Sequence, residues 1–114
     1  MGLSEKTCVP CRGGVLPLTT AEIQPLASQV DHWNVMDNHH VEKEFKFPDF
    51  KAALDFVNRV GIIAEEQGHH PDIFLAWGRT EITLWTHAID GLTESDFIMA
   101  AKIDQVQQPK AKSA

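Results

Sequence analysis

Three of the six histidines lie where proton-transfer chemistry could use them. His69 and His70 are adjacent and are followed by Pro71, while His87 follows a run of β-branched and aromatic residues. Imidazole both donates and accepts protons near neutrality because its unperturbed pKa lies there. Two histidines that meet at one ligand could therefore serve as acid and base in a dehydration. Adjacent loop histidines are also often merely solvated, and their spacing alone leaves both interpretations open.

A metal site is a second use for such residues. Three imidazoles are enough protein ligands for zinc, but the adjacent side chains of His69 and His70 would have to bend around one ion. Cys8 and Cys11 form a single Cys-x-x-Cys pair, whereas a structural zinc site needs four ligands. We therefore expect no metal. We interpret residues 1–18 as an irregular N-terminal arm, with a metal or redox role for the cysteine pair as the less favoured alternative.

The chain before the histidines is expected to form a helix and a hairpin. Thr19 and Glu22 have the spacing of a capping box, so a helix should begin there. Pro25 should kink that helix or shift its start. Two short strands follow, joined by turn residues, at 33–36 and 41–47 with Asp37 and Asn38 between them.

The longest expected helix leads directly to the histidine pair. It opens at Pro48 and Asp49 and stops at Gly68, so Glu65 lies in its last turn. Two further strands, 73–78 and 80–87, are expected to pair through a tight turn at Gly78-Arg79. Strand pleating would place Thr83, Trp85 and His87 on one face, and Ile82 and Leu84 on the other.

A last helix completes the domain. Thr93 and Asp96 resemble another capping box, and apolar residues at helical spacing continue toward Pro109. The resulting order, α-β-β-α-β-β-α, predicts an α+β domain with a four-stranded antiparallel sheet and three helices on one face. The domain should span residues 19–108, between the arm at 1–18 and a C-terminal tail at 109–114.

Size and composition exclude several classes of protein. A chain of 114 residues and 12.7 kDa has room for one domain. Ten Lys and Arg against sixteen Asp and Glu give a net charge of −6, which disfavours direct nucleic-acid binding. The apolar stretches are too short to span a membrane, and the first residues lack the apolar core of a signal peptide. We expect a cytoplasmic protein without a membrane partner.

An ordered set of positions resembles the pterin-4a-carbinolamine dehydratase family. In that family three residues separate an acidic residue from His-His-Pro, an aromatic and a third histidine follow, and an Asp comes after Gly-Leu. All of these positions are matched here, by Glu65, His69-His70-Pro71, Trp77, His87, Gly91-Leu92 and Asp96. Trp33 matches a tryptophan usual in the family, and the resemblance covers about residues 19–108. The cysteine-bearing arm lies outside the pattern, and Trp85 stands where a smaller residue is common.

The resemblance implies a hydro-lyase that eliminates water from a 4a-hydroxytetrahydropterin, such as 4a-hydroxytetrahydrobiopterin. The product would be the quinonoid dihydropterin, in tetrahydropterin recycling, and no cofactor would be needed. The catalytic residues carried over are His69 and His87, as the proton-transfer pair, and His70, which would mainly hold the pterin. The substrate-binding positions carried over are Glu65, Pro71, Trp33 and Asp96.

Each binding position also has a purely structural interpretation. Glu65 could be a solvated residue of a last helical turn, Asp96 a helix cap, and Trp33 a core residue. Family relatives also act as non-catalytic binding or assembly proteins and as transcriptional cofactors, so the fold alone does not decide the function. The intact histidines His69 and His87 favour the enzyme. Unpaired sheet edges, together with the resemblance, predict a homodimer or homotetramer.

Overall fold

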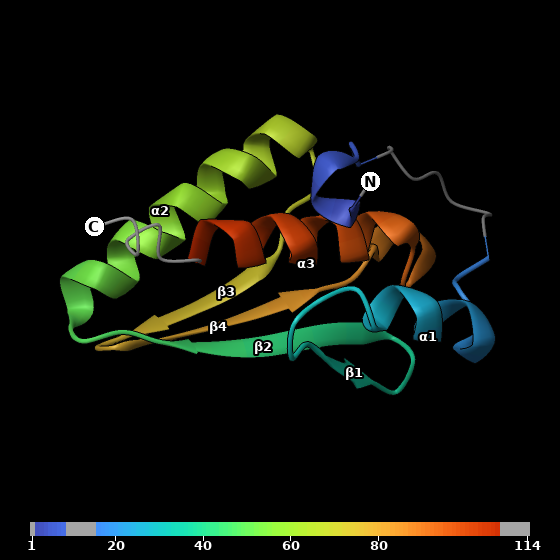
Figure 1. Cartoon of the computed structure of the whole chain (residues 1–114), viewed down its shortest axis with the longest axis horizontal. Helices are drawn as coiled ribbons and strands as arrows, with labels where there is room; N and C mark the ends of the chain where they lie inside the picture. The colour runs from blue at the N-terminus through green and yellow to red at the C-terminus, as the bar shows by residue number, and fades with distance from the viewer. Residues whose placement is uncertain (1, 9–15, 108–114) are drawn as a thin grey trace.

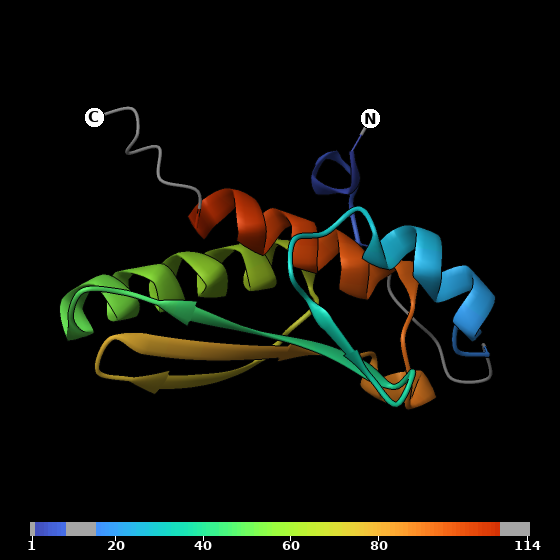
Figure 2. The ribbon, with the colours of Figure 1, turned by 60° about the horizontal axis from the view of Figure 1, so that its bottom comes forward.

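The computed structural model describes residues 2–8 and 16–107. Its four strands form one antiparallel sheet in the order β1-β2-β4-β3, with bounds Asn34–Met36 (β1), His40–Lys46 (β2), Asp72–Ala76 (β3) and Arg79–Leu84 (β4). Its helices are α1 (Thr20–Ala27), α2 (Phe50–Gln67) and α3 (Glu94–Gln107). Figures 1 and 2 show them on the same side of the sheet, so the predicted fold class is confirmed.

The first helix begins as its capping box requires. The Thr19 side chain accepts a hydrogen bond from the Glu22 N–H, and the Glu22 carboxylate accepts one from the Thr19 N–H at 2.9 Å. Pro25 lies inside α1, which ends two residues later at Ala27. Of the two effects predicted for Pro25, the shifted start does not occur, because Thr19 caps the helix and its first residue is Thr20. Figure 1 shows α1 at the end of the molecule where α3 begins.

The predicted first hairpin is present. Met36 pairs with His40, and the turn between them contains Asp37 and Asn38, which both have positive φ. Asp and Asn tolerate this left-handed conformation better than other non-glycine residues, and two such residues in a row suit a tight hairpin turn. The turn also carries His39, whose N–H donates to the Met36 carbonyl at 2.8 Å.

The long helix α2 delivers the histidine pair to one end of the sheet. Asp49 is its N-cap, and its side chain accepts a hydrogen bond from the Ala52 N–H, so the helix begins just after the predicted Pro48–Asp49 start. Gly68 ends the helix in the left-handed conformation, with φ of 64°. The chain therefore leaves α2 sharply, and the His69 N–H donates to the Ala64 carbonyl at 3.2 Å.

The last strand is shorter than predicted. β4 ends at Leu84, and His87 opens a single 3-10 turn, η2 (His87–Ile89), instead of ending a strand. The pairing of β4 ends with Val41–Leu84 on the β2 side and with Asp72–Thr83 on the β3 side. Thr86 instead forms an isolated bridge with Gly91, which closes η2 into a compact loop.

Gly91 is required by a close approach within this loop. A Cβ at this position would lie 2.5 Å from the Cβ of Pro17, which no real pair of side chains tolerates. Nearby, the Leu18 N–H donates to the Leu92 carbonyl at 2.9 Å. Gly91 and Leu92 therefore hold the segment before α1 against the loop that carries His87.

The core lies between the sheet and the helices. The covered face of the sheet buries Val41, Phe45, Ile82 and Leu84. Ile82 and Leu84 of β4 share this face, as the alternation of side chains along the strand predicts. The residues of this face meet buried side chains of α2 and α3, among them Phe56, Val60, Phe97, Ile98 and Ile103. The N-terminal segment takes part as well, because a 3-10 turn, η1 (Leu3–Glu5), packs on α3 and buries Leu3. No helix in residues 2–8 and 16–107 is long and apolar enough to cross a membrane.

Asp104 of α3 joins three parts of the fold and is predicted to be important for stability. Its carboxylate accepts hydrogen bonds from the Trp33 indole N–H at 3.0 Å, the Lys43 ammonium at 2.8 Å and the Asp31 N–H at 3.1 Å. Asp104→Ala should lower the free energy of unfolding by about 2–3 kcal/mol, because the indole N–H loses its acceptor and the mostly buried Lys43 ammonium keeps, among the described residues, only the more distant Asp31 carboxylate, at 3.9 Å. Urea denaturation measures this change.

The matched control is Asp55→Ala, on the exposed face of α2. Asp55 pairs with Lys51 one turn away at 3.3 Å, and both side chains are largely exposed. Its loss should cost less than about 0.5 kcal/mol. Equal effects of the two substitutions would show that the Asp104 network contributes nothing specific.

Candidate active site

A buried carboxylate holds the first histidine of the pair. Nε2 of His69 lies 2.6 Å from Oδ1 of Asp96, and the side chain of Asp96 is fully buried in the first turn of α3. The other oxygen, Oδ2, accepts hydrogen bonds from the Thr86 hydroxyl at 2.8 Å and the Thr93 N–H at 2.9 Å. Asp96 thus caps its helix, as predicted, and also orients His69.

This network assigns the proton of His69. Because both Oδ2 contacts come from donors, the carboxylate acts as an acceptor, and Nε2 of His69 donates to Oδ1. The nitrogen that can take up a proton is then Nδ1. The arrangement is that of a positioned general base whose tautomer is set by a carboxylate.

The same carboxylate ties His69 to the segment that carries His87. Thr86, which bonds to Oδ2 of Asp96, immediately precedes His87 in the chain. The Thr86 hydroxyl also lies 3.0 Å from the hydroxyl of Thr93, so the start of η2 is fixed against the start of α3. Sequence reasoning missed Thr86, since a threonine in a strand-like run is not by itself a signal.

His87 itself is exposed and lies against an aromatic side chain. Its ring centroid is 4.3 Å from that of Trp85, with the planes inclined at 63°. Trp85 in turn lies 4.2 Å from the ring of His39, which sequence reasoning also missed. The imidazole of His87 is therefore open to solvent on one side and supported by aromatic contacts on the other.

His70 has a partner different from that of its neighbour. Its Nε2 lies 2.7 Å from Oε2 of Glu65, and both side chains are more than half exposed. Glu65, His70 and Pro71 line one groove of about 630 Å³ between the end of α2 and β3, whose apolar wall includes Ile62 and Ile73. Three of the predicted site positions thus share this groove, whereas His69 is bonded to Asp96.

Trp33 belongs to a different part of the molecule. It is buried, its indole bonds to Asp104, and its ring packs edge-on against Phe45 at 6.0 Å. Asp104 is about two helical turns, or roughly 12 Å, along α3 from Asp96. The contacts of Trp33 are those of a core residue rather than of the histidine cluster.

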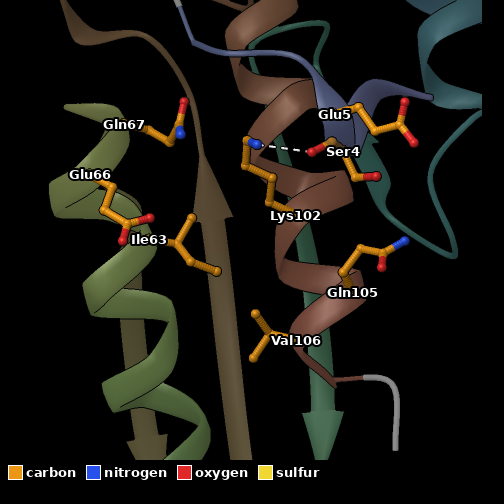
Figure 3. A pocket seen from close by; sticks show the side chains of 8 residues that line it. All are labelled: Ser4, Glu5, Ile63, Glu66, Gln67, Lys102, Gln105 and Val106. Atoms are coloured by element: carbon orange, nitrogen blue, oxygen red, sulfur yellow. Dashed lines mark hydrogen bonds between the residues drawn. The ribbon is translucent and has the colours of Figure 1, made fainter. Parts of the chain in front are cut away.

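A second pocket, of about 480 Å³, lies between α2 and α3. Figure 3 shows its lining, which includes Ile63, Glu66 and Gln67 of α2 and Lys102 of α3. Ser4 closes one side, and its carbonyl accepts a hydrogen bond from Lys102 at 2.9 Å. Among the described residues, no histidine or cysteine lines this pocket. Within residues 2–8 and 16–107, no three His, Cys, Asp or Glu side chains gather as a metal site.

The cysteine pair is predicted to be dispensable for catalysis. Cys8 is buried, its N–H donates to the side chain of Gln67 at 2.8 Å, and its thiol lies 3.5 Å from the Ser95 carbonyl. Cys11 lies outside the described residues. Replacing both by serine should keep turnover within about twofold, because a single Cys-x-x-Cys pair provides neither a four-ligand metal site nor a general base, while Cys8→Ser lowers the melting temperature slightly. Loss of turnover with the fold intact, shown by circular dichroism, would contradict this.

Comparisons with known proteins agree on one family. The family model described as "Pterin 4 alpha carbinolamine dehydratase" matches residues 16–106. A protein of Rubrobacter xylanophilus named "Putative pterin-4-alpha-carbinolamine dehydratase" is 61% identical over 104 residues, which cover 91% of this chain and 97% of the relative.

Two solved structures resemble the fold. A transcriptional coactivator/pterin dehydratase from Brucella melitensis has a TM-score of 0.76 and 35% identity, and the match covers 80% of this chain and 98% of that one. A pterin dehydratase-like protein identified as a RuBisCO assembly factor in the alpha-carboxysome has a TM-score of 0.60 and 22% identity, with coverage of 68% and 92%. At that identity the second likeness concerns the fold alone.

Proposed function

The chain belongs to the pterin-4a-carbinolamine dehydratase family, and we propose that it eliminates water from 4a-hydroxytetrahydrobiopterin to give the quinonoid dihydropterin. In this reaction N5 of the ring loses its proton, the N5–C4a double bond forms, and the C4a–O bond breaks. The departing hydroxyl takes up a proton and leaves as water. One base and one acid are required, and no electrons are exchanged.

His69 is the base in this proposal. The single observation that carries it is the 2.6 Å contact of His69 Nε2 with the buried carboxylate of Asp96, which leaves Nδ1 to accept the N5 proton. The imidazolium that forms is stabilised by the adjacent carboxylate. In our proposal Asp96 is therefore a positioning residue that orients His69. It does not bind the substrate, which is the role that the family resemblance implied.

His87 is the acid, and His70 holds the pterin. An exposed imidazole such as that of His87 exchanges protons directly with water, so it can deliver one to the leaving hydroxyl and be recharged. His70 and Glu65 form an exposed pair at the groove beside Pro71, where they can offer hydrogen bonds to the polar edge of a pterin. Trp33 serves the core instead.

The test is the disappearance of freshly generated 4a-hydroxytetrahydrobiopterin in the presence of purified protein. Loss faster than in buffer supports the activity. The same assay with a 4a-hydroxytetrahydropterin that carries only a methyl group at C6 separates recognition of the ring from recognition of the biopterin side chain. Equal acceleration of the loss of both substrates would indicate that the protein recognises the pterin ring and not the side chain. If the protein accelerates the loss of neither substrate, the proposed dehydration is contradicted.

A non-catalytic binding role is the alternative. It is favoured by the printed description of the Brucella melitensis structure as a transcriptional coactivator as well as a pterin dehydratase. The network around His69 supports the enzyme, since it fixes the direction and tautomer of an imidazole that can act as a base, in addition to satisfying the buried carboxylate of Asp96. The proposal further includes a cytoplasmic location and a homodimer or homotetramer. Exposed apolar side chains near the edge strand β3, Phe74 and Trp77, support self-association, which sedimentation measures.

A further inference from the structure

We propose that His39, in the β1–β2 turn, is a positioning residue that orients the imidazole of His87 through Trp85. The inference rests on the proposed dehydratase activity and deepens it, because it adds a residue from a distant part of the chain. Four contacts link His87, Trp85, His39 and Asp90 in a closed ring of interactions, here called the His87 circuit.

Three of the four contacts join side chains, and the fourth is a backbone hydrogen bond. The His87 ring lies 4.3 Å from that of Trp85, and the Trp85 ring lies 4.2 Å from that of His39. Nε2 of His39 lies 2.8 Å from Oδ1 of Asp90, and the Asp90 N–H donates to the His87 carbonyl at 3.2 Å. His39 thus closes a loop that begins and ends at His87.

The local backbone explains why His87 needs such support. It lies beyond the end of β4, at the start of a single 3-10 turn, so no strand pairing fixes its side chain. Asp90 ends that turn in the left-handed conformation, with φ of 52°. An imidazole on an exposed turn samples several rotamers unless neighbouring rings restrict it.

Magnitudes argue against a role in stability alone. The Asp90 side chain is 83% exposed, and an ion pair or hydrogen bond at such a site contributes little to folding. The His39 side chain is only 31% exposed and contacts His40 as well, with the two Nδ1 atoms 3.1 Å apart. The His39 ring is held between Asp90 and His40 and lies 4.2 Å from the Trp85 ring, so it limits the positions that Trp85 can take.

The variants are His39→Ala, Asp90→Gly and Asp90→Asn. Glycine accepts the left-handed backbone but removes the carboxylate, whereas asparagine tolerates that backbone and keeps an acceptor oxygen. The matched control is His32→Asn, because His32 is highly exposed, has φ of 60° and pairs only with its neighbour Asp31 among the described residues. All variants are compared as the full chain.

The first readout is the NMR signal of the His87 Cε1–H, which is assigned with a His87→Gln variant and reports on the Trp85 ring, 4.3 Å from that of His87. His39→Ala and Asp90→Gly should move this signal toward that of a free histidine, while Asp90→Asn and His32→Asn leave it in place. An unchanged signal in His39→Ala would overturn the inference. This readout needs no turnover, so it remains decisive if the wild-type protein fails to dehydrate the pterin and the proposed function falls.

The second readout is kcat against KM. His39→Ala should lower kcat about tenfold, with little change in KM, because it displaces an acid rather than removing it. The kcat of the double variant His39→Ala/Asp90→Gly should be no lower than that of His39→Ala, since both changes break the same contact. A displaced His87 signal with unchanged kcat, or strictly additive losses, would overturn the positioning role.

Discussion

Replacement of His69 or His87 is expected to lower turnover by about 10²–10⁴-fold, the range for loss of a positioned acid or base. The lower end is favoured, because dehydration of the carbinolamine also proceeds slowly in water and buffer can replace part of a missing group. His69→Gln is the sharper variant, since its amide N–H can still donate to Asp96 but cannot accept the N5 proton. Initial rates of carbinolamine loss measure the effect.

The two histidines should differ in their effect on stability. His69→Ala leaves Oδ1 of the fully buried Asp96 without its partner, so the free energy of unfolding should fall by about 1–3 kcal/mol. His87→Ala, at an exposed position, should leave the melting temperature nearly unchanged. His32→Asn controls for the loss of an imidazole. Full turnover in both His69→Gln and His87→Ala would refute the acid–base mechanism and favour the scaffold function.

Asp96→Asn is expected to be nearly as damaging, although Asp96 does not act on the substrate. The amide oxygen would keep the hydrogen bonds of the Thr93 N–H and the Thr86 hydroxyl, and the amide N–H₂ would face His69. Nε2 of His69 would then have to accept, which moves its proton to Nδ1 and removes the base. A reversed tautomer of this kind costs about 10⁴-fold in the serine-protease triad, and we expect about 10²–10⁴-fold here.

The tautomer provides an independent check of this prediction. The ring nitrogen chemical shifts of His69 should indicate a protonated Nε2 in the wild type and a protonated Nδ1 in Asp96→Asn. Asp55→Asn is the matched control, because it makes the same change at a carboxylate that pairs with Lys51 at 3.3 Å instead of with a histidine. Wild-type turnover in Asp96→Asn, or the same tautomer in both proteins, would contradict the role assigned to the carboxylate.

Local signals in the sequence predicted most of the fold. The capping box at Thr19, the Asp37-Asn38 turn and Gly68 as a helix stop each depend on a few neighbouring residues, and the structure has all three. The end of β4 could not be predicted in this way. Thr86 and His87 continue a β-like pattern, but in the structure Thr86 pairs with Gly91 and the chain turns into η2 at His87.

Part of the candidate site could also be predicted from local sequence signals. The order of His69, His87 and Asp96 along the chain carries the resemblance, and the capping spacing at Thr93 located Asp96 at a helix start. That the same carboxylate also binds His69 depends on how α2 and α3 pack, which no local spacing reveals. His39 and Asp90 carried no signal at all, because their contact joins two turns that are distant in sequence.

The most direct test compares the rate of 4a-hydroxytetrahydrobiopterin loss with wild-type protein and with the His69→Gln/His87→Ala double variant, at neutral pH and low buffer concentration. The account predicts that wild-type protein accelerates the loss in proportion to its concentration, and that the double variant returns the rate to nearly that of buffer alone. Wild-type protein without any acceleration, or a double variant as active as the wild type, would contradict it.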